Sequence, residues 1–326
     1  MAYHRIVYPV AALVTLSILG LARLAWGEPV TLRVGHFPNI THVQALVGHG
    51  LSRQSRGWFE EHLGPDVKIQ WFVYNAGPSA METLFAESID LTYVGPSPAI
   101  NAYAKARGDD IRIVAGAVEG GAALVVQPDS GLRGPVDFRG KKLGTPQLGN
   151  TQDVAARSWL ASGGLKITLT GDDVQVIPTT NPDQLGLFQS RDVDAVWTVE
   201  PWVSRLEMEA NAKILVEERD AIATVLVTST KILASRRDLV RKFVAAHEEL
   251  TEWIRTHPDE AQAAVREELI VETRSNVGAA LVARAWPRIV VTAKISGEPL
   301  DLFVTKAKEA GFLRTAPDLS RLVERP

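Results

Sequence analysis

The sequence of 326 residues contains no cysteine, and its basic residues do not outnumber its acidic ones. Without cysteine the chain cannot form disulfides, thiolate metal sites or a lipid-carrying cysteine at a signal cleavage point. A formal net charge of -3, with no block of lysine and arginine, gives no electrostatic basis for binding nucleic acid. With 46% hydrophobic and 22% charged residues, the length suits about two globular domains of ~150 residues each.

A long hydrophobic run occurs at the N-terminus, where residues 6–22 read IVYPVAALVTLSILGLA. Basic residues precede it, Arg23 interrupts it, and small residues follow at Ala25 and Gly27, the positions that a signal peptidase reads. We therefore predict a signal peptide over residues 1–27 and a periplasmic protein. Because about 17 residues is at the short limit for a spanning helix, an uncleaved anchor in the inner membrane is the alternative.

Short runs rich in β-branched and apolar residues alternate with segments of helical periodicity. Ten of these runs predict strands: VTLRVGHF (30–37), VKIQWFVY (67–74), IDLTYVG (89–95), IRIVAGA (111–117), AALVVQP (122–128), KKLGTP (141–146), VQVIPT (174–179), DAVWTV (194–199), AKILVE (212–217) and TVLVTS (224–229). Beyond about residue 230 the pattern predicts helices alone. This alternation is typical of an α/β fold with mostly parallel sheets.

The places where predicted strands pass into helices share one chemistry. They are FPNITHVQ (37–44), NAGPSAME (75–82), VGPSPAIN (94–101), GTPQLGNTQDVA (144–155) and WTVEPWVS (197–204). Each has Pro, Ser, Thr or Asn where a helix begins, as in N-caps and first turns. Because these junctions lie at the carboxyl ends of strands, we expect their free N–H groups to converge on a cleft for a small anion. Ordinary capping explains any single junction equally well.

The segment GTPQLGNT (144–151) fits the phosphate-loop pattern G-x-x-x-x-G-K-[ST], except that Asn150 stands in place of the lysine. Without a lysine to reach the terminal phosphates, we do not expect nucleotide hydrolysis. Glycines that allow close backbone approach remain, as does a helix start at Asn150 and Thr151 that would face a bound oxyanion.

Patterns for metal binding and nucleophilic catalysis are weak. His36, His42 and His49 are six and seven residues apart, and His36 falls in a predicted strand, so they do not share one helical face. GPSPA (95–99) has Ala99 where the hydrolase elbow G-x-S-x-G needs its last glycine. We therefore predict no metal, no cofactor and no enzymatic activity.

Four segments together resemble the periplasmic substrate-binding proteins of ABC importers for aliphatic sulfonates, taurine and nitrate. They are GHFPNITHVQALVG (35–48), NAGPSAMETLFAESIDLTYVGPSPAINAY (75–103), DFRGKKLGTPQLGNTQDVAARSWL (137–160) and DAVWTVEPWVSRL (194–206). The resemblance implies a two-lobed type II (Venus-flytrap) fold with mixed, mostly parallel sheets. Lobe one would comprise residues 28–117 and 224–326, and lobe two residues 118–223.

The resemblance also implies which residues line the ligand cleft, and it takes them from the five junctions. They are Asn39, Thr41, His42, Gly77, Pro78, Ser79, Gly95, Pro96, Ser97, Gln147, Asn150, Thr151, Trp197, Glu200 and Trp202. The hydroxyl groups of Ser79, Ser97 and Thr151 would donate to the anion beside backbone N–H groups. His42 would either donate to the anion or serve as a capping or packing residue.

Glu200 has two alternative roles. If its carboxylate faces the cleft, it predicts a ligand with an amine, such as taurine, with Trp197 or Trp202 as an aromatic wall. If it points away, it would bind an arginine such as Arg205 or a backbone N–H group. The two tryptophans are equally compatible with packing beneath the cleft.

The resemblance implies an extracytoplasmic solute-binding protein that acts as a monomer and delivers its ligand to a membrane permease with a separate ATPase. An aliphatic sulfonate is the first expectation for the ligand, with taurine or nitrate as alternatives. An enzyme related to the pyrimidine-forming enzyme of thiamine synthesis is the alternative from another class, and export together with the lack of cysteine argues against it.

Overall fold

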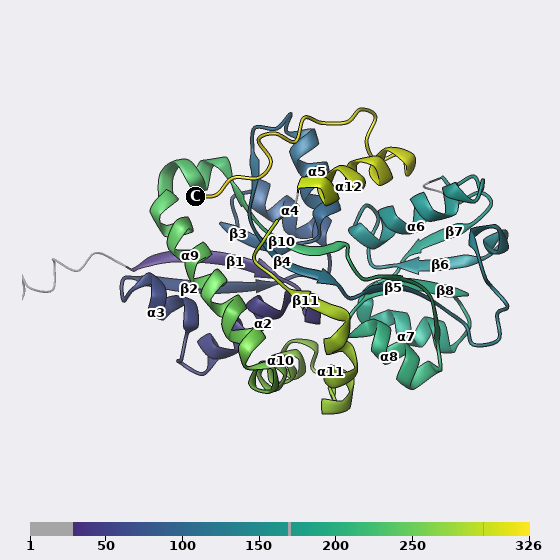
Figure 1. Cartoon of the computed structure of the whole chain (residues 1–326), viewed down its shortest axis with the longest axis horizontal. Helices are drawn as coiled ribbons and strands as arrows, with labels where there is room; N and C mark the ends of the chain where they lie inside the picture. The colour runs from purple at the N-terminus through teal and green to yellow at the C-terminus, as the bar shows by residue number, and fades with distance from the viewer. Residues whose placement is uncertain (1–28, 169–170, 296) are drawn as a thin grey trace, which may run out of the picture.

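The computed structural model describes residues 29–168, 171–295 and 297–326, which form an α/β protein with two separate β-sheets (Figure 1). We call the first sheet with its helices lobe one and the second sheet with its helices lobe two. The predicted signal peptide lies outside the described residues. No helix within the described ranges is long and apolar enough to cross a membrane.

Lobe one is built on a six-stranded sheet in the order β11-β4-β10-β3-β1-β2. Its strands are β1 (Val30–His36), β2 (Val67–Val73), β3 (Leu91–Val94), β4 (Ile111–Gly120), β10 (Ile222–Ser229) and β11 (Ile289–Val291). Its helices are α2 (Val43–Arg53), α3 (Trp58–Leu63), α4 (Gly77–Phe85), α5 (Pro96–Lys105), α9 (Thr230–Thr256), α10 (Pro258–Thr273), α11 (Ala279–Ala285) and α12 (Gly297–Glu309).

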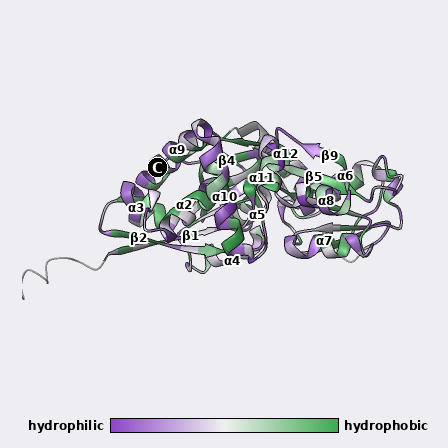
Figure 2. Cartoon of the chain, turned by 90° about the horizontal axis from the view of Figure 1, so that it is seen from below, coloured by the Kyte–Doolittle hydropathy of each residue, from purple (hydrophilic) through white to green (hydrophobic). Residues whose placement is uncertain are grey.

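Both faces of this sheet are covered, which explains why its central strands read as continuous apolar runs. One hydrophobic core joins the sheet to α2, α3, α9, α10 and α11, and it includes Phe59 stacked on Phe243 at 4.3 Å between ring centroids. The other core joins the opposite face to α4, α5 and α12. Figure 2 shows hydrophilic segments along outer helices such as α3 and α9, whose buried apolar residues, among them Phe59 and Phe243, belong to the first core.

Lobe two is smaller and is built on a five-stranded sheet in the order β7-β6-β8-β5-β9. Its strands are β5 (Ala122–Val126), β6 (Lys142–Thr145), β7 (Gln175–Pro178), β8 (Ala195–Val199) and β9 (Lys213–Glu218). Helix α6 (Thr151–Ser162) covers one face, while α7 (Asn181–Gln189) and α8 (Trp202–Ala210) cover the other.

All ten predicted strands are confirmed, but the sheets are not mostly parallel. The pairs β1–β2, β1–β3, β6–β7 and β6–β8 are parallel, whereas β3–β10, β4–β10, β4–β11, β5–β8 and β5–β9 are antiparallel. The difference arises because the chain leaves and re-enters the lobes through β4, β5, β9 and β10. Each of these strands is antiparallel to its neighbours. The expectation of helices alone beyond residue 230 is also wrong, since β11 forms there from only three residues.

The chain passes between the lobes twice, at points that lie side by side. It leaves lobe one at Gly120 and Gly121, which have φ values of +75° and +76°, and it returns between β9 and β10. The N–H group of Gly120 donates to the carbonyl of Ala221 at 2.9 Å, which ties the two crossings together. That the two units move as independent lobes, with the boundaries given above, stays a prediction.

His247 links the helical layer to the sheet beneath the first crossing. Its Nε2 lies 2.8 Å from the carbonyl oxygen of Gly116 on β4, and its Nδ1 lies 3.0 Å from the hydroxyl of Tyr93. Burial lowers the pKa of His247 from 6.5 to about 4, with a smaller opposing effect of its hydrogen bond to Gly116.

We predict that this histidine makes the fold less stable in acid. The neutral imidazole is favoured in the folded state, so its stabilisation is present above the unfolded pKa of 6.5 and is lost as pH falls towards about 4. The loss amounts to about 3 kcal/mol. Urea unfolding of the wild type and His247→Gln at pH 7 and pH 4 measures it. An equal loss of stability in both proteins would contradict the assignment.

Candidate binding cleft

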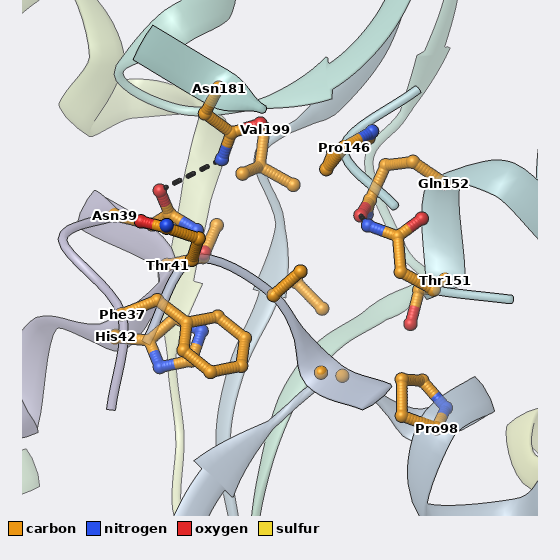
Figure 3. Close-up of a pocket in the computed structure, with 16 residues that line it drawn as sticks. Phe37, Asn39, Thr41, His42, Pro98, Pro146, Thr151, Gln152, Asn181 and Val199 are labelled. Atoms are coloured by element: carbon orange, nitrogen blue, oxygen red, sulfur yellow. Dashed lines mark hydrogen bonds between the residues drawn. The ribbon is translucent and has the colours of Figure 1, made fainter. Parts of the chain in front are cut away.

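A small cavity of about 30 Å³ lies between the two lobes, at the carboxyl ends of β1, β3, β6 and β8. Its size suits a small ion or the headgroup of a larger molecule. Figure 3 shows Phe37, Asn39 and His42 on one side and Thr151 and Gln152 on the other. The lining residues are Phe37, Asn39, Thr41, His42, Asn75, Ala76, Gly77, Gly95, Pro98, Pro146, Asn150, Thr151, Gln152, Asn181, Val199 and Ala223.

Four helices begin at this cavity. Helix α4 starts at Gly77, α5 follows Gly95, α6 follows Asn150 and α7 starts at Asn181. The N-cap residues of α4, α5 and α7 make no side-chain cap hydrogen bond. The four helix starts offer positive dipole ends to a bound anion, but free N–H groups come from α4, α6 and α7, because the two prolines in the first turn of α5 have none and Ser97 N faces Thr151 Oγ1 at 3.4 Å.

The lining is electrically neutral apart from one titratable residue. None of the described residues that line the cavity is Lys, Arg, Asp or Glu, and His42 is the titratable member. Burial, helped by neighbouring His36, lowers the pKa of His42 well below its ordinary value of 6.5. The imidazole is thus neutral at pH 7, and its buried Nδ1 has no hydrogen-bond partner in the described part of the chain. An unpaired buried polar atom of this kind is costly unless a ligand or water binds it.

Polar contacts join the two lobes around the cavity. The side-chain oxygen of Asn39 accepts from Asn181 Nδ2 at 3.2 Å, drawn as the dashed line in Figure 3, and from Trp202 Nε1 at 2.8 Å. On the opposite side, Ser79 and Gln147 approach within 3.3 Å. These contacts hold the lobes together in a closed arrangement.

The loop over residues 144–151 is organised by Asp153 on α6. Its carboxylate accepts from Gly149 N at 2.9 Å and from Thr145 Oγ1 at 3.0 Å. Arg157, one helical turn later, donates to the same carboxylate at 3.1 Å and is 2% exposed. Asn150 caps the helix by accepting from Asp153 N at 2.8 Å. The charge of Asp153 is balanced within the helix, so the loop presents only neutral groups to the cavity.

Glu200 points away from the cavity. Its fully buried carboxylate accepts from Arg288 Nη1 at 2.8 Å and from the Ser204 hydroxyl at 2.9 Å. Burial raises the pKa of Glu200, and the hydrogen bond from Arg288 opposes that shift. Its partner is therefore Arg288 rather than the expected Arg205, which pairs with Glu209 at 3.1 Å.

Neither tryptophan lines the cavity. Trp197 packs in the core of lobe two, with its Nε1 3.4 Å from Glu218 Oε2. Trp202 lies buried against Val199 and uses its N–H group to hold Asn39. Both tryptophans therefore pack beneath the cleft, which was the second of the two roles considered for them.

Seven of the residues proposed from the sequence line the cavity: Asn39, Thr41, His42, Gly77, Gly95, Asn150 and Thr151. Pro78, Ser79, Pro96, Ser97 and Gln147 occupy the same turns without lining it. Their role in binding a ligand stays a prediction. Ser97 Oγ is nevertheless buried without a partner among the described residues, and Ser97 N lies 3.4 Å from Thr151 Oγ1 of lobe two.

Asn181 is the most informative lining residue that the sequence analysis missed. It opens α7 in the segment TTNPDQ (179–184), which has the same Thr, Asn and Pro chemistry as the other five junctions. That signal was present in the sequence. Phe37, Asn75 and Ala76 lie within the quoted junctions but were not singled out.

We predict that Asp153→Asn destabilises lobe two by about 3 to 5 kcal/mol, because it leaves the Arg157 guanidinium buried without its counter-charge. Chemical unfolding measures the loss. The matched control is Glu209→Gln, which breaks another i,i+4 pair with Arg205, but at the surface, and should cost under about 0.5 kcal/mol. Equal effects of the two substitutions would contradict the role given to Asp153.

Known proteins resemble this chain over most of its length. A protein of Brucella abortus described as a binding protein is 25% identical over 314 residues, covering 90% of this chain and 91% of its own. A Bacillus subtilis protein named as an aliphatic sulfonates-binding protein is 28% identical over 226 residues, covering 67% and 66%. A 2'-hydroxybiphenyl-2-sulfinate desulfinase of Rhodococcus erythropolis is 24% identical over 223 residues, covering 52% and 61%.

The fold of this chain also matches that of a solved structure. The alkanesulfonate-binding protein of Xanthomonas axonopodis pv. citri, bound to MOPS, superposes with a TM-score of 0.73 at 22% identity, covering 92% of this chain and 100% of that one. This likeness confirms the periplasmic-binding-protein fold. The NMT1-like family matches residues 25–269, and the chain belongs to that family.

Proposed function

We propose that this chain is the extracytoplasmic solute-binding component of an ABC importer and captures an aliphatic sulfonate between its two lobes. The observation that carries the proposal is the convergence of four helix N-termini on one neutral, buried cavity. We further propose that the protein is a periplasmic monomer and delivers its ligand to a permease with a separate ATPase.

Binding would be driven by donors from both lobes. The anion would accept from N–H groups at the start of α4 in lobe one and at the starts of α6 and α7 in lobe two, while α5, whose first turn holds Pro96 and Pro98, would contribute its dipole. A micromolar ligand needs about 8 kcal/mol, and each hydrogen bond to a charged group contributes about 1.5 to 3 kcal/mol. Four or five such donors therefore suffice without a lysine. Because they come from both lobes, the ligand stabilises the closed form over the open one.

The character of the lining favours an alkanesulfonate over taurine and nitrate. Phe37, Pro98, Val199 and Ala223 give the cavity apolar surface that suits a hydrocarbon tail, which nitrate lacks. Taurine carries an ammonium group that would need an anionic or strongly accepting partner. Glu200, the candidate for that role, is engaged by Arg288. We therefore rank taurine and nitrate as weaker ligands.

A binding protein fits the cavity better than an enzyme does. The chain has no thiol, and the described lining residues include no carboxylate to act as nucleophile or general base. His42 is a buried neutral imidazole without a carboxylate to orient it. The desulfinase among the relatives is named for a sulfinate, a sulfur oxyanion like the headgroup proposed for this cleft.

We predict that Thr151→Ala weakens binding of an alkanesulfonate by about 1 to 3 kcal/mol, because it removes a hydroxyl donor at the start of α6. Titration calorimetry with ethanesulfonate measures the affinity. Ser162→Ala, at the far end of the same helix, removes an exposed hydroxyl bonded only to Trp159 O and serves as the control. Unchanged affinity in Thr151→Ala would remove Thr151 from the site.

A further inference from the structure

A second cluster of polar side chains lies inside lobe one, behind the first junction. His36 is at the end of β1, His49 is on α2, and Glu268 and Glu272 are on α10. We call these four residues the His–Glu cluster. The side chains of His36 and Glu272 are fully buried, and those of Glu268 and His49 are 2% and 9% exposed.

The ligand-type atoms of His36, His49 and Glu272 converge on one point, and Glu268 borders this group through His49. His36 Nε2 lies 3.0 Å from His49 Nδ1 and 3.1 Å from Glu272 Oε1, and the latter two atoms are 2.9 Å apart. Glu268 Oε1 is 3.1 Å from His49 Nδ1. In a tetrahedral zinc site with bonds of about 2.0 to 2.1 Å, donor atoms are separated by roughly 3.3 Å. The spacing of the cluster is close to that value.

Protons alone do not satisfy these atoms. His36 Nδ1 faces the carbonyl of Phe37 at 3.3 Å, and a proton shared there leaves a lone pair on Nε2. His49 Nδ1 carries at most one proton, yet it has three acceptors within 3.1 Å. In addition, Glu272 Oε2 is buried without a partner among the described residues. A cation at the centre would use the lone pairs of His36 Nε2, His49 Nδ1 and Glu272 Oε1 at the same time, which a single shared proton does not.

We propose that the His–Glu cluster binds one divalent transition-metal ion, with Zn²⁺ the best match for two imidazole nitrogens and carboxylate oxygens. The ion would offset the charges of the two glutamates, because among the described residues an arginine, Arg53, pairs with Glu268 at 2.8 Å but none pairs with Glu272. Glu268 and Arg53 also line a solvent-facing groove between α2 and α10, which gives the ion a route of entry.

The metal would have a structural role. It would tie β1, α2 and α10 together, joining the first strand of the sheet to a helix more than 200 residues later in the sequence. His36 directly precedes Phe37, which lines the cleft and lies against the ring of His42 at 4.4 Å between centroids. The ion would therefore fix the first junction from behind without touching the ligand.

The full chain, purified without a polyhistidine tag, tests this proposal. Metal analysis after dialysis against Zn²⁺ and competition with a chromophoric chelator give stoichiometry and affinity. We expect one Zn²⁺ per chain, a higher thermal midpoint, and the intense visible absorption of tetrahedral Co²⁺ when cobalt is substituted. Glu272→Gln should weaken the affinity at least about a hundredfold, because it removes a charged ligand.

His62→Gln is the matched control, because His62 also pairs with a glutamate, Glu249, at 3.0 Å, but on the surface. It should bind Zn²⁺ as the wild type does. Equal affinities in the wild type, Glu272→Gln and His62→Gln would overturn the proposal. If Glu272→Gln fails to fold, the wild type decides alone: less than one tightly bound Zn²⁺, or a weak octahedral Co²⁺ spectrum, overturns it. Neither readout depends on a sulfonate, so the result is separate from the proposed function.

Discussion

Glu200 and Arg288 form a buried ion pair where the two lobes meet, and the charge of the ligand cleft depends on it. Glu200 lies between β8 and α8 of lobe two, while Arg288 comes from the C-terminal part of lobe one. Arg288 also contacts Glu207 of lobe two at 2.8 Å. The pair thus withdraws a carboxylate from the cleft and fastens one lobe to the other.

A cleft without fixed charges can hold an anion because the backbone supplies the field. Helix N-termini present several N–H groups whose partial charges act at close range in a site shielded from water. Lobe two uses a second internal pair, Asp153 with Arg157, to shape the loop over residues 144–151 without placing a charge in the cavity. A neutral site of hydrogen-bond donors would bind an anion and still allow its release, which fits the proposed delivery to a permease.

The sequence predicted those features that depend on neighbouring residues. Apolar runs identified ten strands, and the capping chemistry located three of the four helix starts that meet at the cavity, those of α4, α5 and α6. The sequence did not reveal β11, because three residues carry almost no pattern. For Glu200 it correctly allowed a backbone N–H partner, which is Ser204 N, but it named Arg205 because helical spacing cannot reveal an arginine 88 residues away. His36 and His49 were set aside because they do not share a helix face, yet a strand and the following helix bring them to 3.0 Å. Asn181, by contrast, had the same local signal as the junctions that were found.

The proposed cleft selects a negative headgroup and offers no favourable partner to an amine. Titration calorimetry with ethanesulfonate, taurine and ethylamine tests this most directly, since the three ligands share a two-carbon chain and differ in their charged ends. We expect ethanesulfonate to bind most tightly, taurine to bind more weakly because its ammonium finds no carboxylate, and ethylamine not to bind. Tighter binding of taurine than of ethanesulfonate, or measurable binding of ethylamine, would contradict the account.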